Sequence, residues 1–330
     1  MSAAQTNSNG PQPAMLWLSE NRQLLALPIM FALAVVMFAA AAPNFLTADN
    51  LTNVARQSVY LLIVALGQMI VMITGGLDLS VGSNVSLTSV VSAMVMAAVF
   101  AANPGDPWLA LWAGLGAGVA IGIAVGLVNG LGVTMLGIHP FMMTLGMSSI
   151  VFGLTLFISG GVPIYGIPPL HGEIFGFGRI FGLPIPAFVA IFLVILTYLT
   201  LQWTRFGRHL YATGGNNRAA ALSGVRTSRV TVISYMLCGL LAALSGLLLT
   251  ARLGTGEANI GGTLPLESIA ACVISGVSLT GGRGRTLMVV LGTLLIVLVQ
   301  NGLNLMQVGA YAQSVATGAI LIFAMALSRN

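Results

Sequence analysis

The sequence predicts an all-α polytopic membrane protein with about ten transmembrane helices. Three observations support this fold class: 57% of the 330 residues are hydrophobic, only 6% are charged, and the apolar residues form long runs. A soluble domain has about 25% charged residues, with which it covers its surface. This chain has too few for that purpose, so lipid is the solvent for most of it.

Ten apolar runs approach the length of about 20 residues that a spanning helix needs. The first follows a polar tail, 1–23, and exceeds the roughly 7–15 apolar residues of a secretory signal, so we expect an uncleaved helix. The rest of the chain, 24–330, is expected to form a single transmembrane domain. In order, the runs are 24–42, 57–74, 80–101, 108–136, 140–159, 186–203, 230–250, 264–280, 286–304 and 308–327.

Arginine placement predicts the orientation of these helices. All 12 basic residues are arginine, and they lie between apolar runs, which favours a topological role over nucleic-acid binding. Cytoplasmic connections are enriched in basic residues. The connection 204–229 has five arginines and no acid, so we expect it in the cytoplasm, together with both termini. The connection 160–185, rich in Gly, Pro and aromatic residues, would then be an external structured loop or short amphipathic helix.

The two halves of the chain share a pattern of small and polar residues. An Asn-Gly-Leu triplet begins at Asn129 and is followed by glycines at 137 and 146, and the same pattern recurs from Asn301 at a constant offset. The partners are five helices apart, so the copies would face opposite ways across the membrane. This predicts an inverted repeat of helices 2–5 and 7–10. Chance similarity in a Gly-rich sequence is the alternative.

No nucleotide-binding or catalytic motif is evident. A phosphate-binding P-loop requires a lysine, and the chain contains none. His139, His171 and His209 lie in separate connections or helix ends, and Cys238 and Cys272 fall inside apolar runs. Neither a catalytic cluster nor a metal site is predicted, so we expect a non-enzyme that binds no cofactor itself.

Two acids lie close to apolar runs, where a charge costs about 2.5–3.5 kcal/mol at a helix centre. Asp78 follows Gly75 and Gly76, which interrupt a run, and with Ser80 it can cap the next helix. Glu267 fits a first-turn acid that the helix dipole favours. Two functional alternatives apply to these acids. They could lie at a packed helix junction near a translocation path, or they could form a site for a coupled ion.

Neutral polar residues also lie within the runs. Gln68, Asn129 and Asn301 could bond neighbouring helices or line a path for a polar solute such as a sugar. The sequence is compatible with both interpretations.

The connection 204–229 contains the signals of a short helix. Asn216 or Asn217 is the expected cap, an alanine run follows, and Ser223-Gly224 ends it. This predicts a cytoplasmic helix of about two turns. It is either a plain connector or an element that inserts into a partner's groove.

Three separated segments resemble the signatures of ribose-type sugar ABC transporter permeases. Residues 75–82 read GGLDLSVG, residues 204–208 and 214–225 read TRFGR and GGNNRAAALSGV, and residues 278–284 read SLTGGRG. The similarity extends from about residue 24 to the C-terminus. Relatives carry ribose, xylose, arabinose or galactose, and also a furanone-like autoinducer.

The resemblance implies a multi-pass permease in the bacterial inner membrane that pairs with a second permease copy, identical or related. A cytoplasmic ABC ATPase would bind ATP and Mg²⁺, and a periplasmic sugar-binding protein would deliver the substrate. A branched-chain amino acid permease, an ion-coupled carrier and a membrane-embedded enzyme are the alternatives. The residues implied in coupling to the ATPase are Gly215, Asn216, Asn217, Arg218, Ala219, Ala220, Ser223 and Gly224.

Overall fold

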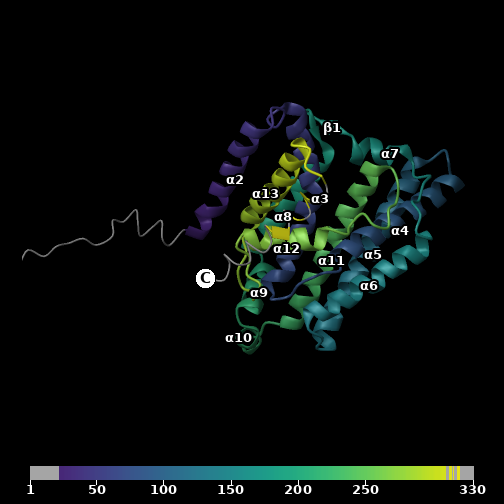
Figure 1. Cartoon of the computed structure of the whole chain (residues 1–330). Coiled ribbons are helices and arrows are strands. Elements are labelled where there is room, and N and C mark those ends of the chain that lie inside the picture. Colours follow the sequence, from purple (N-terminus) through teal and green to yellow (C-terminus); the bar gives the residue numbers. More distant parts are fainter. Residues whose placement is uncertain (1–21, 310–311, 314, 316–317, 320–330) are drawn as a thin grey trace, which may run out of the picture.

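The computed structural model describes residues 22–309, 312–313, 315 and 318–319. These residues form a helical bundle (Figure 1). Among them, seven helices are long and apolar enough to cross a membrane, which confirms the all-α polytopic class. They are α3 (Ala48–Ile73), α4 (Val81–Ala102), α5 (Pro107–Met135), α6 (Pro140–Ser159), α8 (Ile185–Trp203), α11 (Thr227–Leu253) and α13 (Thr286–Leu305).

The other three predicted runs differ from this group. The first is α2 (Arg22–Ala41), whose apolar part is shorter than the other spans. The run 308–327 lies mostly outside the described residues. The count of ten therefore stays a prediction, and so does the inverted repeat, whose last helix would fall in that run.

The run 264–280 does not form one spanning helix. Helix α12 (Leu264–Ile274) has 11 residues, about 16 Å at 1.5 Å per residue, which is half the thickness of a hydrocarbon core. It ends because Gly276 takes φ +78°, and Gly281 and Gly282 also have positive φ. Hydropathy detected an apolar segment here, whereas the glycines decide where the helix stops.

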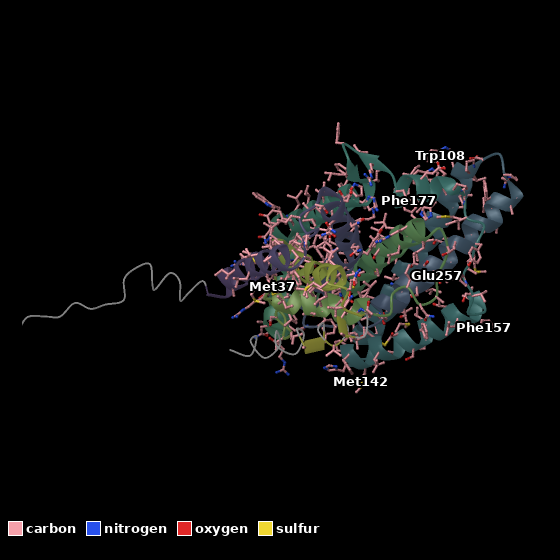
Figure 2. The ribbon with its side chains drawn as sticks, turned by 45° about the horizontal axis from the view of Figure 1, so that its top comes forward. Met37, Trp108, Met142, Phe157, Phe177 and Glu257 are labelled. Carbon is pink, nitrogen blue, oxygen red and sulfur yellow. The ribbon has the colours of Figure 1, made fainter. Side chains whose placement is uncertain are left out.

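The outside of the bundle is apolar. Met37 on α2 and Met142 and Phe157 on α6 are exposed large side chains (Figure 2). A soluble protein rarely exposes contiguous apolar surface on this scale. The exterior therefore suits lipid or another membrane-embedded surface.

Helix α11 packs against α3, α4 and α5 at the centre of the bundle (Figure 1). Glycines allow the closest approaches: a Cβ at Gly126 would overlap the carbonyl oxygen of Tyr235, and one at Gly239 would overlap that of Gly122. Close backbone contact of this kind holds helices together in lipid, where the hydrophobic effect does not.

The connection between α11 and α12 runs back along α4. The amide of Glu257 donates to Ser89 Oγ at 3.1 Å, and the amide of Gly261 donates to Ser86 Oγ at 3.2 Å. The non-helical segment 254–263 thus packs against α4, although four of its ten residues are exposed. Side-chain hydroxyls of α4 satisfy two of its amides, as irregular backbone at membrane depth requires.

The connection 204–229 contains two helices, α9 (Arg205–Gly215) and α10 (Asn217–Leu222). The expected short helix is confirmed as α10, whereas α9 was not predicted because glycines at both of its ends disfavour a helix. Thr204 caps α9 by accepting from the amide of Gly207 at 3.2 Å. Figure 1 shows α10 at the bottom of the bundle and β1 at the top, so this connection and 160–185 lie at opposite ends.

The connection 160–185 is structured, as expected. It contains the single turn α7 (Pro169–His171), the π-helix η1 (Gly172–Gly176), and the antiparallel pair β1 (Arg179–Ile180) and β2 (Leu183–Pro184). Element η1 packs against α11, where a Cβ at Gly176 would overlap the carbonyl oxygen of Ala251.

His171 is fully buried in this connection. Its ring lies edge-on to Phe175 with centroids 6.1 Å apart, and neither ring nitrogen has a hydrogen-bond partner among the described residues. Burial lowers the pKa of His171 to about 4. The neutral ring is therefore the form that the fold accepts.

Acid should destabilise the fold through His171. The unfolded chain binds this proton near pH 6.5 and the folded chain only near 4, so the stability is complete above pH 6.5 and falls as pH drops toward 4, by up to about 3 kcal/mol. Thermal unfolding of detergent-solubilised protein at pH 7.5 and pH 5 measures the loss. His171→Phe should reduce the pH dependence of the unfolding temperature. An equal pH dependence in both proteins would show that His171 does not cause the loss of stability in acid.

Candidate functional site

The break between α3 and α4, residues 74–80, is organised around a buried carboxylate. Asp78 is 2% exposed, and its Oδ1 accepts from the amide of Ser80 at 2.8 Å and from its hydroxyl at 2.6 Å. Asn129 Nδ2 donates to Ser80 Oγ at 2.7 Å and lies 3.5 Å from Asp78 Oδ1. With its amide oxygen and nitrogen assigned from the surrounding donors and acceptors, the Gln68 side chain spans the Asp78 backbone, donating to its oxygen at 3.0 Å and accepting from its nitrogen at 3.2 Å. Four predicted residues thus meet in one cluster.

Further helices hold the same break. The carbonyl oxygen of Leu77 accepts from the Tyr235 hydroxyl at 3.1 Å and from Thr144 Oγ at 3.3 Å. Gly75 has φ +85°, and Gly76 leaves room for Tyr235, whose hydroxyl oxygen would lie 2.7 Å from an added Cβ. Side chains of α3, α5, α6 and α11 therefore fix this non-helical backbone, as an apolar environment demands.

The capping interpretation of Ser80 is wrong. Ser80 occupies the N-cap position of α4, but its side chain makes no capping bond and donates to Asp78 instead. The reason is its backbone, with φ −83° and ψ −5°, because a capping side chain needs the extended region. Asp78 binds Ser80 rather than the first turn of the helix.

The three signature segments meet at a second junction, built from backbone atoms. The amide of Gly282 donates to the carbonyl oxygen of Ile73 at 2.9 Å. A Cβ at Gly214 would overlap that same oxygen and would lie 2.6 Å from the Gly282 nitrogen. A Cβ at Gly281 would lie 2.9 Å from the Gly75 nitrogen. We call Ile73, Gly75, Gly214, Gly281 and Gly282 the glycine junction.

A side chain reinforces this junction. The Tyr211 hydroxyl, on α9, donates to the carbonyl oxygen of Gly284 at 2.8 Å. Helix α9 thus contacts the segment 275–285 through its backbone at Gly214 and is hydrogen-bonded to it by Tyr211. The same segment is hydrogen-bonded to the end of α3 through Gly282 and Ile73.

Helix α10 follows α9 directly and is presented to solvent. Asn216 caps it by accepting from the amide of Ala219 at 3.0 Å, and Gly224, at φ +85°, lies just past its end, as expected. Leu222 is 91% exposed, while Ala220 is 6% exposed and faces the protein. Of the residues implied in coupling, those with exposed positions are Gly215, Asn216, Asn217, Arg218, Ala219, Ser223 and Gly224.

Sequence reasoning missed Leu222 and the glycine junction. The signal for Leu222 was available, since a leucine in a short helix of small and polar residues has no core of its own to fill. The glycines of the junction lie in the three signature segments, but nothing in the sequence indicated that they meet. Gly214 and Gly282 are 68 residues apart, and only the fold brings their backbones together.

Glu267 and Asn301 do not join the Asp78 cluster. Glu267 lies in the first turn of α12, as predicted, and its Oε1 accepts from Gln300 Nε2 at 3.1 Å. Asn301 and Asn50 exchange side-chain amide hydrogen bonds at 2.9 Å in both directions. Both residues act between helices. In the part of the chain that the structure describes, no group of three or more His, Cys, Asp or Glu residues could hold a metal ion.

Comparison with known proteins identifies the family of this chain. Residues 50–325 match the family described as branched-chain amino acid transport system / permease component. The ribose import permease of Bacillus subtilis is 40% identical over 298 residues, which cover 90% of this chain and 89% of that protein. The D-allose transport system permease of Escherichia coli is 35% identical over 301 residues, 91% of this chain and 90% of that one.

The galactose/methyl galactoside import permease of Escherichia coli is also 35% identical, over 311 residues that cover 91% of each chain. No solved structure matches this chain significantly. The matched region contains the Asp78 cluster, the glycine junction and α10. This chain therefore belongs to that permease family and is a homologue of ribose, allose and galactose import permeases.

Proposed function

We propose that this chain is the membrane-spanning permease subunit of an ABC importer that carries a monosaccharide of the ribose, xylose, arabinose or galactose type. The observation that carries the proposal is the match to sugar import permeases over about nine-tenths of both chains. The convergence of the three signature segments supports it, since it joins an exposed cytoplasmic helix to a break in the membrane helices.

The proposed location is the bacterial inner membrane, with 1–23 and the C-terminus in the cytoplasm and 24–330 forming one domain. The arginines of 204–229 support a cytoplasmic position for α9 and α10. Since α8 separates the two connections, 160–185 then faces outward.

Coupling to ATP would pass through α10. A cytoplasmic ATPase, which binds ATP and Mg²⁺ in place of this chain, docks on α10 and moves it. Helix α9 carries that movement to Ile73 and Gly282 at the glycine junction, and from there to the Asp78 cluster. A periplasmic sugar-binding protein delivers substrate to the opposite face, and a second permease copy, identical or related, completes the pathway.

Reconstitution tests the proposal. Proteoliposomes that contain the permease, its ATPase and its binding protein should take up a labelled monosaccharide when ATP is supplied on the cytoplasmic side. An ion gradient without ATP should drive no uptake. Uptake driven by the gradient alone would establish a secondary carrier, and uptake of leucine rather than a sugar would favour the amino acid function in the family's description.

Leu222→Glu should prevent ATP-driven uptake while leaving membrane insertion intact. The side chain is 91% exposed, so the fold loses nothing, but a charge would meet the docking surface of the ATPase. Pull-down of the ATPase and uptake measure the effect. Ser228→Glu, another exposed position in the same connection, is the control and should behave like the native protein. ATPase binding and uptake that survive Leu222→Glu would exclude α10 as the docking element.

A further inference from the structure

A cavity of about 240 Å³ lies between α4, α6 and the segment that returns along α4. Its volume is just below the roughly 300–1,000 Å³ of pockets for drug-sized ligands, and so suits one small solute. Seven of its nine lining residues are serine, asparagine or glycine, although apolar atoms make up the larger part of the wall. The lining residues are Gly82, Ser83, Ser86, Ser148, Phe152, Asn259, Gly261, Gly262 and Pro265.

The cavity lies near the middle of the membrane-spanning bundle. Asn84, between two lining serines, donates to the carbonyl oxygens of Gly122 at 3.3 Å and Gly239 at 3.4 Å. Gly122 is near the centre of the 29-residue α5, and Gly239 is near the centre of the 27-residue α11. Transported solutes bind at this depth in many carriers, where broken helices provide polar groups.

The lining offers uncharged hydrogen-bonding groups. Neither the Ser148 hydroxyl nor the Asn259 side-chain amide has a partner among the described residues. Ser83 Oγ donates to the carbonyl oxygen of Ser80 at 2.9 Å and retains its acceptor capacity. Phe152, which is 39% exposed, adds an aromatic face. Hydroxyls and an amide beside one ring match a solute that has both hydroxyl groups and an apolar C–H face.

Charged solutes fit less well. No residue that lines the cavity carries a charge. Glu257, labelled in Figure 2, is in the same segment but is not part of the wall, and its Oε1 accepts from Thr255 at 3.1 Å. At the start of α12, the amide of Leu264 already donates to Gly261 and Pro265 has no N–H, so few donors remain for a carboxylate.

We propose that this cavity is a monosaccharide-binding subsite on the translocation pathway, in which Ser148 and Asn259 bond the ring hydroxyls and Phe152 covers the apolar face. This inference rests on the proposed sugar import. It also connects the subsite to the coupling machinery. Gly82 follows Ser80 by two residues, and a Cβ on it would overlap the carbonyl oxygen of Gly261, just before α12.

Single cysteines test the subsite. Cys238 and Cys272 are both fully buried, so an introduced thiol at the cavity would be the one that a methanethiosulfonate reagent reaches. Ser148→Cys points into the cavity. Ser149→Cys is the matched control, because Ser149 is exposed on the next position of α6 and does not line the cavity. Both variants are reconstituted with the ATPase and the binding protein, and labelled ribose, xylose, arabinose and galactose are the probes.

Modification of Ser148→Cys should lower ATP-driven sugar uptake by about tenfold or more, whereas modification of Ser149→Cys should not. The transported sugar, delivered with ATP present, should slow the labelling of Ser148→Cys alone. Unchanged uptake after modification, or labelling that the sugar does not slow, would overturn the subsite. Sugar uptake by the variants before modification tests the proposed importer function separately from the proposed subsite. If Ser148→Cys fails to insert, the same labelling experiment can be done with Asn259→Cys, in the connection between α11 and α12.

Discussion

Gly214→Ala is expected to abolish ATP-driven uptake. The added Cβ would overlap the carbonyl oxygen of Ile73 and crowd the Gly282 amide that binds it. Both neighbours are backbone atoms of other elements, so the crowding has no flexible side chain to absorb it. Overpacking of this kind costs about 1–3 kcal/mol. If the same free energy acts on an equilibrium between a joined and a separated glycine junction, the equilibrium constant changes by a factor of about 5–150.

A glycine outside the proposed coupling region provides the control. No atom lies within 4 Å of a Cβ placed at Gly116 of α5, so Gly116→Ala should insert, bind the ATPase and transport like the native protein. Uptake and sugar-stimulated ATP hydrolysis are measured for both variants at equal protein in the membrane. We expect Gly214→Ala to bind the ATPase but to lose stimulation and uptake. Equal uptake by the two variants would show that the glycine junction does not transmit movement.

Asp78→Ala should have the second large effect, on both folding and transport. It would leave the Ser80 amide and hydroxyl without their acceptor in a site that is 2% exposed. Each unpaired buried group costs about 1–3 kcal/mol. Thermal unfolding in detergent and uptake in proteoliposomes should both decline. Asp106→Ala, which removes an exposed cap that accepts from the amide of Leu109, is the control and should cost about 1 kcal/mol without loss of uptake.

Asp78→Asn distinguishes the hydrogen-bonding role of this side chain from a role of its charge. The asparagine retains an oxygen that can accept from Ser80, so it should recover most of the stability and uptake that Asp78→Ala loses. If Asp78→Asn folds normally but transports nothing, the charge itself is needed. That outcome would favour an ion-binding role for this carboxylate over the structural role proposed here.

The helices themselves followed from hydropathy, because a bilayer demands apolar runs of a set length. The structure departs from the predicted helices at α12 and at α9, and glycine is the cause in both places. Glycines end α12 at Ile274 although the apolar run continues, and glycines at the ends of α9 concealed a helix that packing stabilises. A single glycine has no periodic pattern from which its φ can be inferred. Only its neighbours in the fold determine it.

The candidate site was predicted residue by residue but not as an arrangement. Asp78, Ser80, Asn129 and Gln68 were each singled out as polar groups near or within apolar runs, and the structure joins them. Ser148 and Asn259 escaped notice, because a neutral side chain without a sequence motif carries no signal of its own. Their significance comes from a cavity whose walls are far apart in the chain.

The short helix α12 has a mechanical consequence. A helix resists stretching because its hydrogen bonds are continuous, and here that continuity stops at 254–263 on one side and at 275–285 on the other. An axial shift of α12 would break no turn of α11 or α13. Rotation about the backbone bonds of Gly276, where an added Cβ would meet no atom within 4 Å, would accommodate it. Helix α12 is thus a rigid segment between two non-helical connections, one that lines the cavity and one that leads to the glycine junction.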